Sequence, residues 1–65
     1  MSSREVIKVL LADGWREVAH HTPGSHRQFR HEEKKGKVTV PEHGSRDIPI
    51  GTLKSIGKQS GLSFA

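Results

Sequence analysis

Histidine is the residue type in this sequence best suited to proton transfer at neutral pH, and one of the five histidines, His26, has neighbours suited to chemistry on a phosphate. Gly24 and Ser25 precede it, and a tight turn through them would leave backbone N–H groups facing an anion. An imidazole beside a bound phosphate can act as a general acid or base. RNA carries its own nucleophile, the 2′-hydroxyl, so these residue types suit metal-independent RNA cleavage, although Gly-Ser-His alone is a weak motif.

The spacing of the histidines argues against a metal site. His20 and His21 are adjacent, and His26 and His31 are five residues apart, so within an extended strand each pair points to opposite faces. Cysteine is absent, which excludes a zinc site held by thiolates. We therefore predict no metal and no other cofactor. The remaining histidines are expected to be surface residues or hydrogen-bonded polar groups; they are His20, His21, His31 and His43.

The elements that position His26 begin with an N-terminal helix. Ser2 and Glu5 form an S-x-x-E capping box, in which each side chain satisfies a backbone N–H at the helix start. Gly14 is a natural stop, which places the helix at about Ser3–Asp13. Its apolar stripe is predicted to consist of Val6, Ile7, Leu10 and Leu11.

A second helix is predicted near the C-terminus. Pro49 suits its first turn, where the missing N–H costs nothing. Gly61 ends it, and Leu62 is expected to fold back over the end as a hydrophobic cap. Gly51 and Gly57 weaken the helix, so we expect close packing against the sheet at these positions. The buried stripe is predicted to be Ile50, Leu53 and Ile56.

Three strands are predicted between the helices. The pattern of the first strand fits no single register, because Trp15 and Val18 have opposite parity and cannot both face one core from a regular strand. Pro41 ends the third strand and indicates an edge or terminal position, since proline has no N–H to donate. The predicted strands are Trp15–His21, His26–His31 and Lys37–Val40, and the predicted loops are Glu32–Gly36 and Glu42–Ile48.

The order of these elements predicts an α+β fold, α-β-β-β-α, with both helices on one face of a three-stranded antiparallel sheet. A chain of 65 residues permits one domain, residues 1–65, and an apolar content of 31% means that its core is thin. The second face of the sheet is then open to solvent.

Strand parity assigns side chains to the two faces. Phe29 is the large apolar residue of the second strand and should face the helices, so His26, Gln28 and Arg30 point to the open face. Lys37 points the same way from the third strand. A histidine, an amide and two cations suit contacts to phosphate and ribose, although an ordinary solvated sheet face has a similar composition.

Charge and composition indicate which class of molecule the protein binds. The formal net charge is +4, and the first 22 residues are balanced, so the whole basic excess lies after Thr22, which favours a polyanion. Only three aromatic residues are present, too few for a base-stacking platform once the core is filled. No signal peptide or membrane span is evident, so we expect a cytoplasmic protein without membrane association.

Two blocks of the sequence resemble the HicA family, the toxin half of bacterial toxin–antitoxin pairs. The first is Gly24–Phe29, similar to the family's G-S-H motif with an aromatic residue three positions on. The second runs through Val38–His43 and Ile48–Ile56 to Gly61–Leu62. With the opening helix that ends before Trp15, the resemblance covers nearly the whole chain.

This resemblance implies a fold like that of a double-stranded-RNA-binding domain and ribosome-independent cleavage of messenger RNA. It implies that His26 is the catalytic histidine. It also implies a HicB-type antitoxin partner that covers the active surface, with DNA bound only through the antitoxin complex. The residues expected to contact RNA are Gly24, Ser25, Gln28, Arg30 and Lys37, together with Lys54 and Lys58 of the second helix.

Two other functions fit the same composition. A non-catalytic RNA-binding module of the same fold would bind RNA in a salt-sensitive way and leave it intact. A protein-interaction module, whose charge serves an acidic partner, would show no affinity for RNA at moderate salt. Histidine at position 26, where binding alone would favour Lys or Arg, favours the nuclease.

Overall fold

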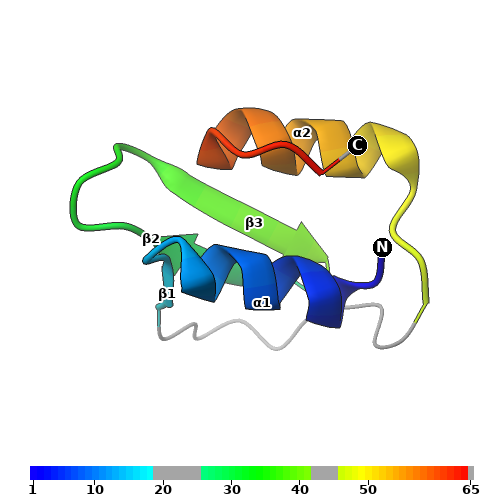
Figure 1. Ribbon diagram of the computed structural model, residues 1–65, viewed down its shortest axis with the longest axis horizontal. Helices are drawn as coiled ribbons and strands as arrows, with labels where there is room; N and C mark the ends of the chain where they lie inside the picture. Colours follow the sequence, from blue (N-terminus) through cyan, green and yellow to red (C-terminus); the bar gives the residue numbers. More distant parts are fainter. Residues whose placement is uncertain (19–25, 42–45, 65) are drawn as a thin grey trace.

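The computed structural model describes residues 1–18, 26–41 and 46–64, and its element order confirms the α-β-β-β-α prediction. The three strands form one antiparallel sheet in the order β1-β2-β3 (Figure 1). One core cluster contains residues of both helices and of a single sheet face, so both helices pack on that face. The elements are α1 (Ser3–Ala12), β1 (Arg16–Glu17), β2 (His26–Arg30), β3 (Lys37–Pro41) and α2 (Ile50–Ser60).

Helix α1 begins with the predicted capping box. The Ser2 N–H donates to Glu5 Oε1 at 2.9 Å, and the Glu5 N–H donates to Ser2 Oγ at 3.3 Å. The bond from the Ser2 backbone holds the pKa of Glu5 below its ordinary value. The helix ends at Ala12, one residue earlier than predicted, and Gly14 follows with φ +98°. Leu11 was wrongly assigned to the buried stripe, because it lies at the edge of the apolar face and is 52% exposed.

Among the described residues, strand β1 comprises Arg16–Glu17, so Trp15 and Val18 of the predicted Trp15–His21 lie outside it, and residues 19–21 lie outside the described part of the chain. Trp15 precedes the strand, and its N–H donates to the Leu10 carbonyl at 3.0 Å. This turn directs its ring into the core, where the residue is 1% exposed. Trp15 therefore need not share strand parity with Val18, which removes the conflict seen in the sequence. The N–H of Val18 donates to the Gln28 carbonyl at 2.9 Å and extends the pairing of β1 with β2.

The pairing of β2 with β3 confirms the predicted faces. Phe29 lies opposite Val38, and Arg27 lies opposite Val40. Phe29 and both valines are fully buried, so this face carries the core.

Strand β3 is an edge strand, and side chains of the two helices form hydrogen bonds with the backbone on its outer side. The Thr39 N–H donates to Gln59 Oε1 at 2.9 Å, and the Pro41 carbonyl accepts from Ser3 Oγ at 2.9 Å. These bonds show that Thr39 and Pro41 direct their backbone groups away from β2. The missing N–H of Pro41 therefore removes no ladder bond, and the predicted edge position is confirmed.

Helix α2 buries Leu53 and Ile56 as predicted, but Ile50 is 65% exposed. Ile48, which precedes the helix, fills the end of the core expected for Ile50, and its N–H donates to the Met1 carbonyl at 2.7 Å. The predicted buried stripe therefore reaches one turn too far toward the N-terminus of α2. Residues spaced three apart shift gradually around a helix with 3.6 residues per turn, so a stripe built on that spacing leaves the buried face.

The two glycines inside α2 differ in their surroundings. A Cβ on Gly57 would lie 2.8 Å from the Leu62 carbonyl oxygen, so the close approach is to the C-terminal segment and not, as predicted, to the sheet. A Cβ on Gly51 would meet nothing within 4 Å, so the expected packing there is absent. Gly61 ends the helix at φ +74°, and Leu62 packs on the core, as predicted.

Candidate active site

The open face of the sheet carries the side chains that parity assigned to it. His26, Gln28 and Arg30 alternate with the buried residue of β2, and Lys37 lies opposite Arg30 on β3. His26, Arg30 and Lys37 are exposed, and Gln28 is half-buried. Arg16 lies opposite Arg30 on the other side and adds a third cation that the sequence reasoning missed, because the register of β1 was unknown.

The histidine and the cations occupy different ends of β2. His26 is the first residue of the strand and lies opposite Pro41, whereas Arg30 is the last. Four residues along a strand separate two Cα atoms by about 13 Å. Gln28, opposite Thr39, lies between them. Gly24 and Ser25, predicted to turn the chain into His26, lie outside the described residues, as do His20, His21 and His43.

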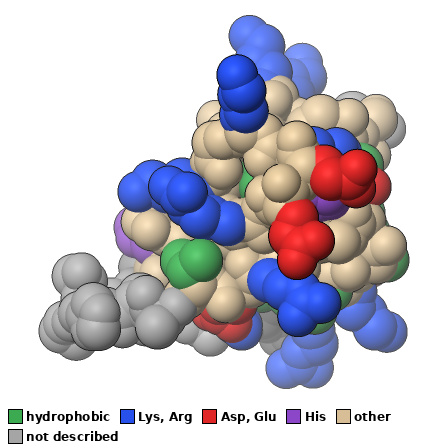
Figure 2. All heavy atoms as spheres, turned by 90° about the vertical axis from the view of Figure 1, so that its left-hand side faces the viewer, with side chains coloured by type: hydrophobic (Ala, Val, Ile, Leu, Met, Phe, Trp, Pro, Cys, Tyr) green, Lys and Arg blue, Asp and Glu red, His purple; other side chains and the backbone are tan. Residues whose placement is uncertain are grey.

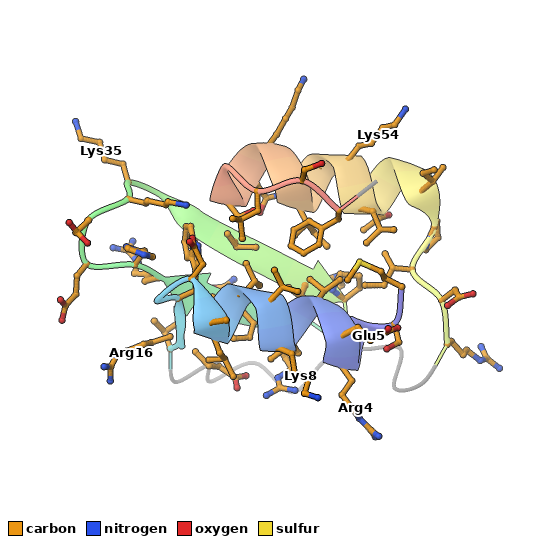
Figure 3. The ribbon with its side chains drawn as sticks, in the orientation of Figure 1. Arg4, Glu5, Lys8, Arg16, Lys35 and Lys54 are labelled. Carbon is orange, nitrogen blue, oxygen red and sulfur yellow. The ribbon has the colours of Figure 1, made fainter. Side chains whose placement is uncertain are left out.

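Lys54 and Lys58 lie on a second surface. Both are exposed and one helical turn apart on α2, which covers the sheet face opposite to His26. Figure 3 shows Lys54 extending away from the sheet. The predicted RNA-contacting residues are therefore divided between the open face of the sheet and the outer side of α2.

Behind His26, an ion pair joins the first two strands. Arg27 Nε donates to Glu17 Oε2 at 2.7 Å, and Arg27 Nη2 donates to Glu17 Oε1, which makes a two-bond fork. The two side chains are 32% and 31% exposed. Arg27 lies opposite Val40 and Glu17 opposite Phe29, so the fork is on the face of the sheet away from His26.

His31 has a structural role. The sequence predicts only that it is a surface residue or a hydrogen-bonded polar group, and the structure shows its partners. Its Nδ1 accepts from the Glu33 N–H at 3.0 Å and from the Lys34 N–H at 3.2 Å. The proton must therefore be on Nε2, which donates to the Asp13 carbonyl at 2.7 Å. The ring also meets Trp15 edge-on, with centroids 5.3 Å apart.

Asp13 and Lys34 connect three elements beside His31. Lys34 Nζ donates to Asp13 Oδ2 at 2.7 Å and to the Ser60 carbonyl at 3.1 Å, and Trp15 Nε1 donates to Asp13 Oδ2 at 3.2 Å. The hydrogen bond from Lys34 holds the pKa of Asp13 below its ordinary value. No local sequence signal could have found this cluster, because its members are far apart in the chain.

A cavity of ≈ 400 Å³ opens next to this cluster. Its walls include the carboxylates of Glu32 and Glu33, which oppose a polyanion. Figure 2 shows this end of the molecule, where Lys and Arg side chains project around the carboxylates. The lining residues are Leu11, Asp13, Gly14, Trp15, Arg16, His31, Glu32 and Glu33, so the cavity contains no predicted site residue.

Within residues 1–18, 26–41 and 46–64, no three His, Asp or Glu side chains gather as a metal site. No helix in the same ranges is long and apolar enough to cross a membrane.

A basic domain with two helices on one face of a three-stranded sheet, and a histidine on the other, has the α+β fold of the double-stranded-RNA-binding-domain class. The family model for the HicA toxin of bacterial toxin–antitoxin systems matches residues 3–62, so the chain belongs to the HicA family. The resemblance noted in the sequence is thereby confirmed. The protein is the toxin of a toxin–antitoxin system, and its partner is a cognate antitoxin. A comparison with curated proteins found no match.

Proposed function

We propose that this toxin is an endoribonuclease that cleaves messenger RNA without a metal ion, with His26 as its proton-transfer group. The observation that carries the proposal is the exposure of His26 at the start of β2, on a polar sheet face opposite the core. A rigid strand position holds the imidazole in place while leaving it accessible to a substrate. Because the substrate is messenger RNA, the reaction takes place in the bacterial cytoplasm.

The proposed reaction is an internal transesterification of RNA. The 2′-oxygen attacks the adjacent phosphorus as its proton leaves, the bond from phosphorus to the 5′-oxygen breaks, and that oxygen gains a proton. The products are a 2′,3′-cyclic phosphate and a 5′-hydroxyl, and no water is consumed. His26 serves one of the two proton transfers, as general base to the 2′-hydroxyl or as general acid to the leaving oxygen.

The remaining residues bind and position the RNA. Gln28, the nearest described side chain on the same face of β2, is suited to the ribose or phosphate beside the cleaved bond. Arg30 and Lys37 lie about 13 Å along the strand from His26, which suits phosphates further along the RNA and not the charge that develops at the cleaved bond. We assign further RNA contacts to Gly24 and Ser25, which lie outside the described residues, and to Lys54 and Lys58, which would hold another part of the RNA backbone.

The antitoxin partner follows from the same surface. We propose that a HicB-type antitoxin inhibits the toxin by covering the open face of the sheet, which would exclude RNA from His26. The family resemblance implies that the toxin reaches DNA only as part of the antitoxin complex.

The test is cleavage of a messenger RNA transcript by wild type and His26→Ala in the presence of EDTA. We expect the variant to retain the wild-type circular dichroism spectrum and RNA affinity but to lose cleavage by at least about 100-fold. Lys35→Ala, which removes an exposed cation of the hairpin, is the matched control and should cleave normally.

Three results would count against the proposal. Full activity of His26→Ala would remove His26 from the reaction. Loss of wild-type activity with EDTA would indicate a metal site. RNA that binds wild type and stays intact after long incubation would support the non-catalytic RNA-binding module instead.

A further inference from the structure

We infer that Arg27 and Glu17 are positioning residues for His26, and this inference rests on the proposed function. Arg27 follows His26 directly in β2, and its side chain reaches across to Glu17 of β1. The two side chains point to the core face, so they do not contact an RNA bound on the open face. They act on the reaction through the backbone that carries His26.

Among residues 1–18, 26–41 and 46–64, the fork lies where the sheet offers little other support. β1 contains two residues, and the described backbone bond that extends its pairing runs from the Val18 N–H to the Gln28 carbonyl. On the opposite side, Val40 is buried and anchors Arg27 through the β2–β3 pairing. On the other side of β2, the fork holds Arg27 to Glu17 of β1, and Arg27 is the residue directly after His26.

The geometry of the fork explains why arginine is needed. Two parallel N–H donors meet two carboxylate oxygens, so the pair fixes the direction of the Arg27 side chain as well as its distance from Glu17. A lysine would keep the charge but make a single, freely rotating contact. A shift of the reacting group by about 1 Å is enough to slow a chemical step by as much as about 100-fold.

The fork can fail without unfolding the protein. Both side chains are about one-third exposed, and ion pairs at such positions contribute little to the free energy of unfolding because solvent screens them. Phe29, Val38 and Val40 are fully buried, so we expect the core to stay in place when the fork is removed. A change in catalysis can therefore be separated from a change in stability.

The experiment compares Arg27→Lys, Glu17→Gln and the double variant, with Arg4→Lys as the matched control. Arg4 is exposed on α1, away from the sheet (Figure 3), so its replacement should change nothing. Initial rates on a short RNA give kcat and KM for each protein. Hydrogen exchange of the Val18 amide reports the pairing of β1 with β2 independently of activity.

We expect each single variant to lower kcat about 10-fold with KM changed by less than about 2-fold, because positioning acts on the chemical step. The double variant should be no slower than the single ones, since both remove the same contact. Exchange at Val18 should accelerate, while the midpoint of urea unfolding stays near the wild-type value.

The inference is overturned if kcat is unchanged, if KM alone rises, or if activity falls only in proportion to the unfolded fraction. Cleavage by His26→Ala at the wild-type rate would overturn the proposed function and this inference with it. An inactive His26→Ala beside fully active fork variants would overturn the inference alone.

Discussion

At the scale of the residue, two histidines that flank β2 are used in different ways: His26 is the first residue of the strand, and His31 follows its last residue, Arg30. Parity and a preceding turn motif were enough to predict that His26 is exposed on the open face. The environment of His31 could not be predicted, because its partners are the Asp13 carbonyl and the N–H groups of a loop. Backbone groups carry no sequence signature, so a histidine that binds them resembles any other histidine in the sequence.

The bonds of His31 make a stability prediction. His31→Ala removes the acceptor for two loop N–H groups and the donor to the Asp13 carbonyl, and it leaves space beside Trp15. We expect a loss of about 2–3 kcal/mol in the free energy of unfolding, measured by urea denaturation. The fraction that remains folded should still cleave RNA. A free energy of unfolding equal to that of wild type would contradict the structural role.

At the scale of the element, most of the fold was predictable because local rules agreed with one another. The capping box, the stop glycines and the alternation of Val38 and Val40 each predicted what the structure shows. The errors at Leu11 and Ile50 share a cause, since each residue lies at the margin of an apolar stripe. Which margin residue is buried depends on tertiary neighbours, and periodicity alone does not report them.

The two glycines of α2 give a matched prediction at this scale. Gly51→Ala places a methyl group in open space and should stabilise the protein by roughly 0.5 kcal/mol through reduced freedom of the unfolded chain. Gly57→Ala reduces the freedom of the unfolded chain in the same way, but it puts Cβ 2.8 Å from the Leu62 carbonyl oxygen. We therefore expect net destabilisation by about 1–3 kcal/mol. Thermal unfolding should therefore shift upward for one variant and downward for the other. Equal shifts in the unfolding temperature of the two variants would mean that the segment around Leu62 moves away from the added methyl group without loss of stability.

At the scale of the whole molecule, a thin core without disulfides is supplemented by polar contacts between distant segments. The Asp13–Lys34 pair connects the end of α1 to the β2–β3 hairpin, and Lys34 continues to the carbonyl of Ser60 at the end of α2. Positions 13, 34 and 60 meet only in the folded chain, which is why sequence reasoning did not find the connection. Because protonation of the Asp13 carboxylate removes its ion pair with Lys34, the connection responds to pH.

The direction of that response follows from Asp13. Lys34 holds the pKa of this carboxyl below its ordinary value, so the stabilisation is complete above the unfolded-state pKa of about 4 and is lost as pH falls through the lower pKa of the folded protein. Asp13→Asn should be less stable than wild type at pH 7, and the difference should shrink toward pH 3. Urea unfolding at both pH values measures it, and Lys34→Met should show the same convergence because it removes the same partner. A difference between wild type and Asp13→Asn that stays constant from pH 7 to pH 3 would show that the contribution of Asp13 comes from its neutral contacts and not from its charge.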